Sequence, residues 1–138
     1  MATNSYKESF RAYLSDTSAY GNVYYFSYHR WVAITKENFF INKVSGFSDL
    51  FHKHNMKLFV LQSSLSISNE AKLHEVITVI LTCTLLKKLK AILSFIIYNS
   101  EGKQLAESLN TIIFVNSKNE IIPIPDNIRQ ALLSISNK

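Results

Sequence analysis

The residues most suggestive of chemistry lie in one stretch, Gly21 to Phe40, which reads GNVYYFSYHRWVAITKENFF. A small polar turn leads into an aromatic-rich helix start, an apolar helix face follows, and charges come at Lys36 and Glu37. An exposed charge pair is the ordinary interpretation of Lys36 and Glu37 on a helix, but Glu37 could act as a base if it faced a cavity. The stretch therefore predicts a helix that presents candidate polar groups.

Several other chemistries have no matching pattern in this sequence. The pair His52 and His54 has no carboxylate at ligand spacing beside it, so we expect no metal site. A nucleophile elbow is absent, and three glycines are too few for a phosphate-binding or dinucleotide-binding loop. Cys83 is the single cysteine and is expected to be a small buried hydrophobe. We expect neither a metal nor a cofactor.

The composition predicts one domain covering residues 1–138. The apolar content of 47% is enough for a core, and no apolar run is long enough to cross a membrane. The first ten residues, MATNSYKESF, contain no apolar signal core. We therefore expect a cytoplasmic protein that does not associate with a membrane.

The chain is basic, with a formal net charge of +5 and a pI near 9.3. Only Lys87, Lys88 and Lys90 form a cluster, so the basic residues are not massed as nucleic-acid binding requires. We expect no nucleic-acid partner. An acidic protein or a phosphate-bearing ligand fits the charge as well.

The hydrophobic patterns predict an α+β fold that begins with a strand and a long helix, followed by four strands in meander order. The predicted strands cover residues 8–15, 57–68, 75–86, 90–99 and 104–116. The predicted helices cover 26–42, 48–54 and 126–133, with Asp126 as the cap of the last one. Residues 87–90 are either a turn or a helix.

The predicted long helix can cover only one face of this sheet. Strands such as VITVILTCTLL are apolar on both faces, so the second face needs a partner. The pattern therefore predicts an oligomer, at least a dimer.

The run from Gly21 to Trp31 resembles the loop and central helix of the hotdog-fold acyl thioesterases of the 4-hydroxybenzoyl-CoA thioesterase type. It is most similar to the thioesterases that release polyketide chains from enediyne synthases, which carry nearly the same G-N-V-Y-Y-x-x-Y-x-R-W run. Four further segments resemble family motifs in order and spacing. They are Met56–Leu61, Leu73–Val76, Asn99–Phe114 and Ile122–Leu132.

The resemblance implies a single-domain hotdog fold, in which an antiparallel five-stranded sheet wraps around a long central helix. It also implies hydrolysis of an acyl thioester carried by coenzyme A or by an acyl carrier protein, which is acidic and bears a phosphopantetheine arm. A homodimer or homotetramer is the implied assembly. The task needs a polarised thioester carbonyl, a held water and an apolar tunnel for the acyl chain.

The catalytic residues implied by the resemblance are Ser18, Tyr28, Lys36 and Tyr25. Ser18 stands where many relatives have a catalytic carboxylate and the enediyne-type relatives have asparagine, and it would orient water or the thioester oxygen. Lys36 replaces the helix arginine of those relatives and keeps its charge without the planar fork. Tyr28 and Lys36 would stabilise the developing oxyanion, and the Tyr25 amide would polarise the carbonyl.

Gly21, Asn22 and Glu37 are the implied substrate-binding residues, and Asp16 matches a family acid usually taken as structural. The leading hypothesis is a thioesterase for a polyketide or fatty acyl chain, possibly a β-keto chain, on an acyl carrier protein. One alternative is an acyl-CoA thioesterase. Another is a non-catalytic hotdog protein that binds acyl chains or a partner, which the Ser18 and Lys36 replacements support. A hotdog dehydratase has the least support, because the helix acid and loop histidine typical of that enzyme are not apparent in the sequence.

Overall fold

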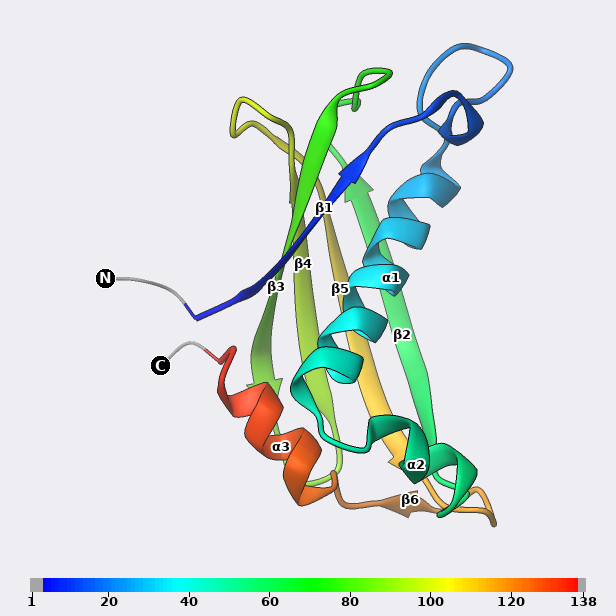
Figure 1. Cartoon of the computed structure of the whole chain (residues 1–138), viewed down its shortest axis with the longest axis vertical. Helices are drawn as coiled ribbons and strands as arrows, with labels where there is room; N and C mark the ends of the chain where they lie inside the picture. The colour runs from blue at the N-terminus through cyan, green and yellow to red at the C-terminus, as the bar shows by residue number, and fades with distance from the viewer. Residues whose placement is uncertain (1–3, 137–138) are drawn as a thin grey trace.

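The computed structural model describes residues 4–136, so the first three residues of the N-terminal segment discussed above lie outside it. Figure 1 shows its helices and strands in chain order. The strands are β1 (Tyr6–Arg11), β2 (Lys57–Ile67), β3 (Val76–Leu86), β4 (Ala91–Tyr98), β5 (Gln104–Val115) and β6 (Ile121–Ile122). The helices are α1 (Tyr25–Lys43), α2 (Phe47–His52), α3 (Asp126–Leu133) and the short 3-10 turn η1 (Leu14–Asp16).

All strand pairs are antiparallel, and the sheet order is β1-β3-β4-β5-β2, with β6 paired to β5. The predicted meander holds for β3, β4 and β5 but is wrong for β2. The free edge of β3 is taken by β1, with Tyr6 opposite Leu81, so β2 pairs with β5 at the far edge. The predicted α+β hotdog fold is confirmed, with the two-residue β6 as an addition to the five expected strands.

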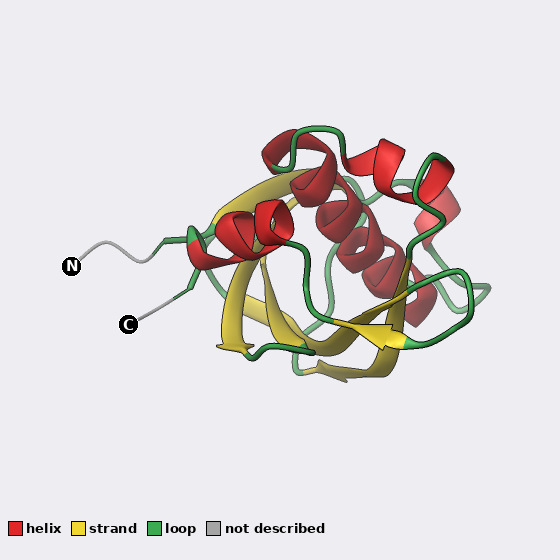
Figure 2. Cartoon of the chain, turned by 90° about the horizontal axis from the view of Figure 1, so that it is seen from below, coloured by secondary structure: helices red, strands yellow, loops and turns green. Residues whose placement is uncertain are grey.

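The long helix α1 lies in the concave face of the sheet, which curves around it in Figure 2. Trp31, Tyr28 and Phe39 of α1 are at most 1% exposed and belong to the same core as the fully buried Leu93 and Phe95 of β4. On β1, Phe10 stacks on Trp31 and Tyr6 meets Phe39 edge to face. Each fully buried large apolar side chain contributes roughly 1.5–3 kcal/mol relative to an exposed one. This layer of side chains fixes the rotation of α1, and therefore decides which of its residues face outward.

The ends of the sheet are closed by short elements. Residues 87–90 form the β3–β4 turn, with the Lys87 amide bonded to the Lys90 carbonyl at 2.8 Å. Helix α3 covers the end of β3, where the Cys83 amide donates to the Ile135 carbonyl at 2.9 Å. Its N-cap is Pro125, so Asp126 lies in the first turn and is not the predicted cap; a carboxylate there still favours the helix through the dipole.

Strand β2 is an edge strand, and most of its residues are exposed. Its apolar side chains include Phe59, Val60 and Leu61, which are 44%, 39% and 61% exposed. An eleven-residue edge with apolar side chains is a surface that a further strand could pair with.

Candidate functional site

The loop before α1 is fastened to the helix by one buried carboxylate, Asp16, which is 2% exposed. It accepts hydrogen bonds from the Tyr13 amide at 2.8 Å, from Ser27 Oγ at 3.1 Å and from Arg30 Nη2 at 2.7 Å. Burial alone would raise the pKa of Asp16, but these hydrogen bonds outweigh it and the net pKa is lowered. With its oxygens occupied, Asp16 positions the loop and is poorly placed to act on a substrate.

Ser18, Gly21 and Asn22 close a tight turn in that loop. Ser18 Oγ donates to Asn22 Oδ1 at 3.0 Å, and the Gly21 amide donates to the Ser18 carbonyl at 3.0 Å. Gly21 has φ near 87°, a conformation that favours glycine. The turn places Ser18 and Asn22 on the wall of a cavity of about 310 Å³, which Tyr25 and Tyr28 also line.

Helix α1 begins at Tyr25, and the N-cap residue Tyr24 makes no side-chain cap hydrogen bond. The first amides of a helix lack intrahelical partners, and they carry the positive end of the helix dipole. Tyr25 lines the same cavity as Ser18 and Asn22, so its amide suits an oxygen that gains negative charge there.

Tyr28 is 1% exposed, and its phenol oxygen accepts a hydrogen bond from the Ala71 amide at 2.9 Å. Burial is the main reason why the pKa of this phenol is raised, so it stays protonated. Tyr28 thus ties the β2–β3 connection to α1 while its hydroxyl hydrogen remains able to donate. The structure gives it an anchoring contact, and its predicted catalytic role stays a prediction.

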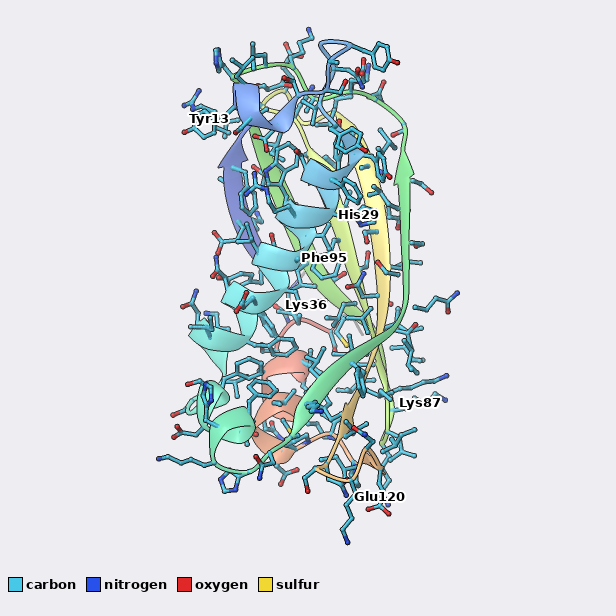
Figure 3. All side chains as sticks on the ribbon, turned by 90° about the vertical axis from the view of Figure 1, so that its right-hand side faces the viewer. Tyr13, His29, Lys36, Lys87, Phe95 and Glu120 are labelled. Atoms are coloured by element: carbon cyan, nitrogen blue, oxygen red, sulfur yellow. The ribbon has the colours of Figure 1, made fainter. Side chains whose placement is uncertain are left out.

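Lys36 and Glu37 lie in the C-terminal half of α1, away from the loop. Both line an apolar groove of about 830 Å³ whose walls come from α1, α2 and β2, with Phe40, Phe47 and Phe59 among the lining residues. Lys36 is half-buried and Glu37 is exposed. Figure 3 shows Lys36 beyond His29 along α1.

The contacts of Lys36 were not predicted from the sequence. Its Nζ donates to Oδ1 of Asn110, on β5, at 3.1 Å. Among residues 4–136 the recorded salt bridges are Arg30–Asp16 and Lys53–Asp49, so no carboxylate pairs with Lys36 there. Burial lowers the pKa of the ammonium. A lone asparagine within the apolar run SLNTIIFV was the one sequence signal that could have pointed to Asn110.

Within one chain the predicted catalytic residues therefore form two groups. Ser18, Tyr25 and Tyr28 surround the start of α1, whereas Lys36 is eleven residues after Tyr25 along the same helix. At 1.5 Å per residue, that spacing separates the two positions by about 16 Å along the helix axis. The two groups also face different hollows of one chain: Ser18, Tyr25 and Tyr28 line the cavity of about 310 Å³, and Lys36 lines the groove of about 830 Å³.

The remaining candidate residues stay apart from these groups. His52 and His54 are exposed at and after the end of α2, and residues 4–136 contain no cluster of ligands that could hold a metal ion. No helix in the same part of the chain is long and apolar enough to cross a membrane.

Comparison with solved structures finds this fold in thioesterases. The dynemicin thioesterase superposes with a TM-score of 0.88 at 19% identity, over 97% of this chain and 99% of that one. A 1,4-dihydroxy-2-naphthoyl-CoA thioesterase from Synechocystis gives 0.86 at 17% identity, over 94% and 96% of the two chains. A 4-hydroxybenzoyl-CoA thioesterase in complex with 4-hydroxybenzoyl-CoA gives 0.84 at 15% identity, over 94% and 99%.

These structural neighbours are hotdog-fold thioesterases, and the chain has their fold over nearly its whole length. No protein-family model and no curated protein sequence matches the chain. At identities below 25% the likeness establishes the fold, and the activity has to be argued from the site.

Proposed function

We propose that this protein is a thioesterase that hydrolyses a polyketide or fatty acyl thioester, with an acyl carrier protein as the carrier. The observation that supports it most is the apolar groove of about 830 Å³ with one half-buried ammonium, Lys36, on its wall. Such a groove can take an acyl chain, and an ammonium in a partly dry site stabilises an oxyanion far better than it would in water.

We further propose that the enzyme is a homodimer, in which each site combines the two groups of residues from different copies. A two-fold axis that crosses α1 and the free edge of β2 would bring the Lys36 end of one helix to the Tyr25 end of the other. The exposed apolar residues of β2 would be covered by the same contact. Two such dimers joined through the outer sheet faces would make the homotetramer that the resemblance also allows.

In this proposal the thioester carbonyl oxygen accepts from the Tyr25 amide, and Ser18 with Asn22 orients a water molecule. The water oxygen attacks the carbonyl carbon, and negative charge builds on the carbonyl oxygen next to Lys36 of the partner subunit, with Tyr28 donating. The tetrahedral intermediate then expels the thiolate, which takes up the proton that the water loses. The products are a carboxylic acid and the free thiol, and a β-keto acid would lose carbon dioxide afterwards. Gly21 shapes the turn, and Glu37 contacts the chain in the groove.

An acyl-CoA thioesterase remains the second candidate, because Lys57 stands at the wall of the same groove and could contact nucleotide phosphates. A non-catalytic acyl-binding role would instead follow if the Ser18 and Lys36 replacements have removed the chemistry. One panel of thioester substrates, which varies both the carrier and the chain length, distinguishes these candidates.

The test is hydrolysis of acyl-CoA, acyl-N-acetylcysteamine and acyl-carrier-protein thioesters of graded chain length. We expect turnover of carrier-protein substrates, and a loss of about 100-fold in kcat for Lys36→Ala, the size seen when one oxyanion donor is removed. Lys43→Ala, an exposed lysine in the last turn of α1, should retain native activity. Binding of acyl chains without turnover of any substrate would reject the enzyme and favour the binding protein.

A further inference from the structure

A polar cluster interrupts the apolar inner face of the sheet directly beneath Lys36. Asn110 and Ser108 of β5 are 3% and 0% exposed, and Ser63 of β2 stands opposite Asn110. On the β4 side their partners are the fully buried Leu93 and Phe95. Buried polar groups in such surroundings are stable only when they are hydrogen-bonded, so the directions of their bonds are informative.

The bonds of Asn110 allow only one orientation of its side-chain amide. Its Nδ2 donates to Ser63 Oγ at 3.2 Å and to Ser108 Oγ at 3.4 Å. Its Oδ1 accepts from Lys36 Nζ at 3.1 Å. An ammonium can only donate, so a flipped amide would place an N–H₂ group against Nζ and lose this bond. The ammonium therefore fixes the Asn110 oxygen toward α1, and the two serine hydroxyls accept the hydrogens of Nδ2 on the other side.

The neutral acceptor matters for the charge on Lys36. A carboxylate at the same place would hold the ammonium equally well but would cancel much of its field. An amide oxygen takes one of the three ammonium hydrogens and leaves the full positive charge, with the other two hydrogens available toward the groove. A charge held in place before the reaction stabilises a developing oxyanion without a reorganisation cost.

We propose that Asn110 is a positioning residue, anchored beneath Lys36 by hydrogen bonds to Ser63 and Ser108, that directs the Lys36 ammonium toward the reacting thioester. The inference rests on the thioesterase function proposed above. It gives a residue of β5 a role in the site, whereas the other proposed site residues lie on the loop before α1 and on α1 itself.

Among the residues that the structure describes, no other titratable group that lines the groove is buried beside Lys36. The titratable side chains that line the same groove are Glu37 of α1 and Lys57 of β2, and both are exposed. From β5 the side chain that faces Lys36 is Asn110, which is neutral. Changes at position 110 should therefore act on Lys36 without passing through a second titrating group.

The experiment compares Asn110→Asp and Asn110→Leu in the full chain, with Asn119→Asp as an exposed control for the same change of charge. The titration of Lys36 is followed by NMR of protein labelled with carbon-13 at the lysine Cε, and Lys36→Met identifies the signal. In Asn110→Asp the pKa of Lys36 should rise, because a carboxylate favours the ammonium. In Asn110→Leu it should fall, because the ammonium loses its acceptor. Asn119→Asp should change nothing.

In parallel we expect kcat to fall at least tenfold in both position-110 variants, while KM changes less than threefold. The alkaline limb of the kcat profile should move in opposite directions in the two variants, which a loosened fold would not produce. Thermal unfolding shows whether each variant is folded.

An unshifted Lys36 titration in folded Asn110→Asp and Asn110→Leu overturns the inference, and so does a shifted titration with native kcat. Native protein that hydrolyses no thioester rejects the proposed function and with it the catalytic use of Asn110. The NMR titration then still decides whether Asn110 controls Lys36, so the two failures are distinguishable.

Discussion

At Lys36 a half-buried cation is held by a neutral amide, with no carboxylate paired to it among the described residues. Burial of a charge without a counter-charge is unfavourable, and here it lowers the pKa of the ammonium. Lys36 also lines the apolar groove, so its unneutralised charge lies where the proposed oxyanion role requires it.

The rate should depend on Lys36 being protonated. Because burial lowers the pKa of Lys36, activity should be present below that pKa and fall as the pH rises through it, earlier than an exposed lysine would titrate. Lys36→Arg keeps the charge at all these pH values, so its kcat profile should lose this alkaline limb. Stopped assays of kcat across the alkaline range measure the profiles of the native protein and of Lys36→Arg. If the activity of Lys36→Arg falls over the same pH range as that of the native protein, another group titrates.

Tyr28 should matter for stability whether or not it donates to substrate. Tyr28→Phe removes the acceptor of the Ala71 amide, and Ala71 is 4% exposed, so a buried donor is left unpaired. The expected loss in the free energy of unfolding is about 1–3 kcal/mol, from urea denaturation. Tyr20→Phe is the control, since Tyr20 is 94% exposed and should change stability by less than about 0.5 kcal/mol.

At the scale of elements, the loop 12–24 depends on Asp16 for its attachment to α1. The carboxylate receives hydrogen bonds from Tyr13, Ser27 and Arg30, and these place the Ser18–Asn22 turn beside the first turn of the helix. A change at Asp16 should therefore reach the site through the position of the loop.

Asp16 should also make stability depend on acid pH. Its pKa in the folded state is lowered, so its contribution is present above the unfolded pKa of about 3.9 and is lost as the pH falls through the folded pKa. Asp16→Asn should lower stability at neutral pH by about 2 kcal/mol and flatten this acid dependence. Thermal unfolding from pH 7 downward measures both, and an equally steep acid loss in the variant would contradict the assignment.

Local pattern was sufficient to predict most elements. The expected helix 26–42 is Tyr25–Lys43, and the later strands agree to within about one residue at each end, because periodicity and turn residues act locally. The partner of β2 was missed, because pairing with β5 depends on β1 having taken β3, which no local pattern records. The Lys36–Asn110 contact was missed for the same reason, since it joins residues 74 apart in sequence.

At the scale of the whole molecule, we propose a second copy of the chain for two reasons. It covers the free edge of β2, and it brings its Lys36 to the Ser18, Tyr25 and Tyr28 group of the first copy. Leu61 is 61% exposed on that edge. Leu61→Asp should weaken the dimer and lower the specific activity together, because a charge would be buried at the contact. Light scattering after size exclusion gives the mass; Ile121→Asp, on β6 and 54% exposed, is the control and should leave the mass unchanged. A native chain that is monomeric and active would contradict the shared site.

The most direct test of a thioesterase site shared between two copies is to mix Ser18→Ala with Lys36→Ala after each is shown to be nearly inactive. In a two-fold dimer the mixed species would have one site with native Ser18 and native Lys36, so exchange of subunits should restore about a quarter of the native rate. A mixture that exchanges subunits yet hydrolyses the thioester no faster than the better variant alone would contradict the account.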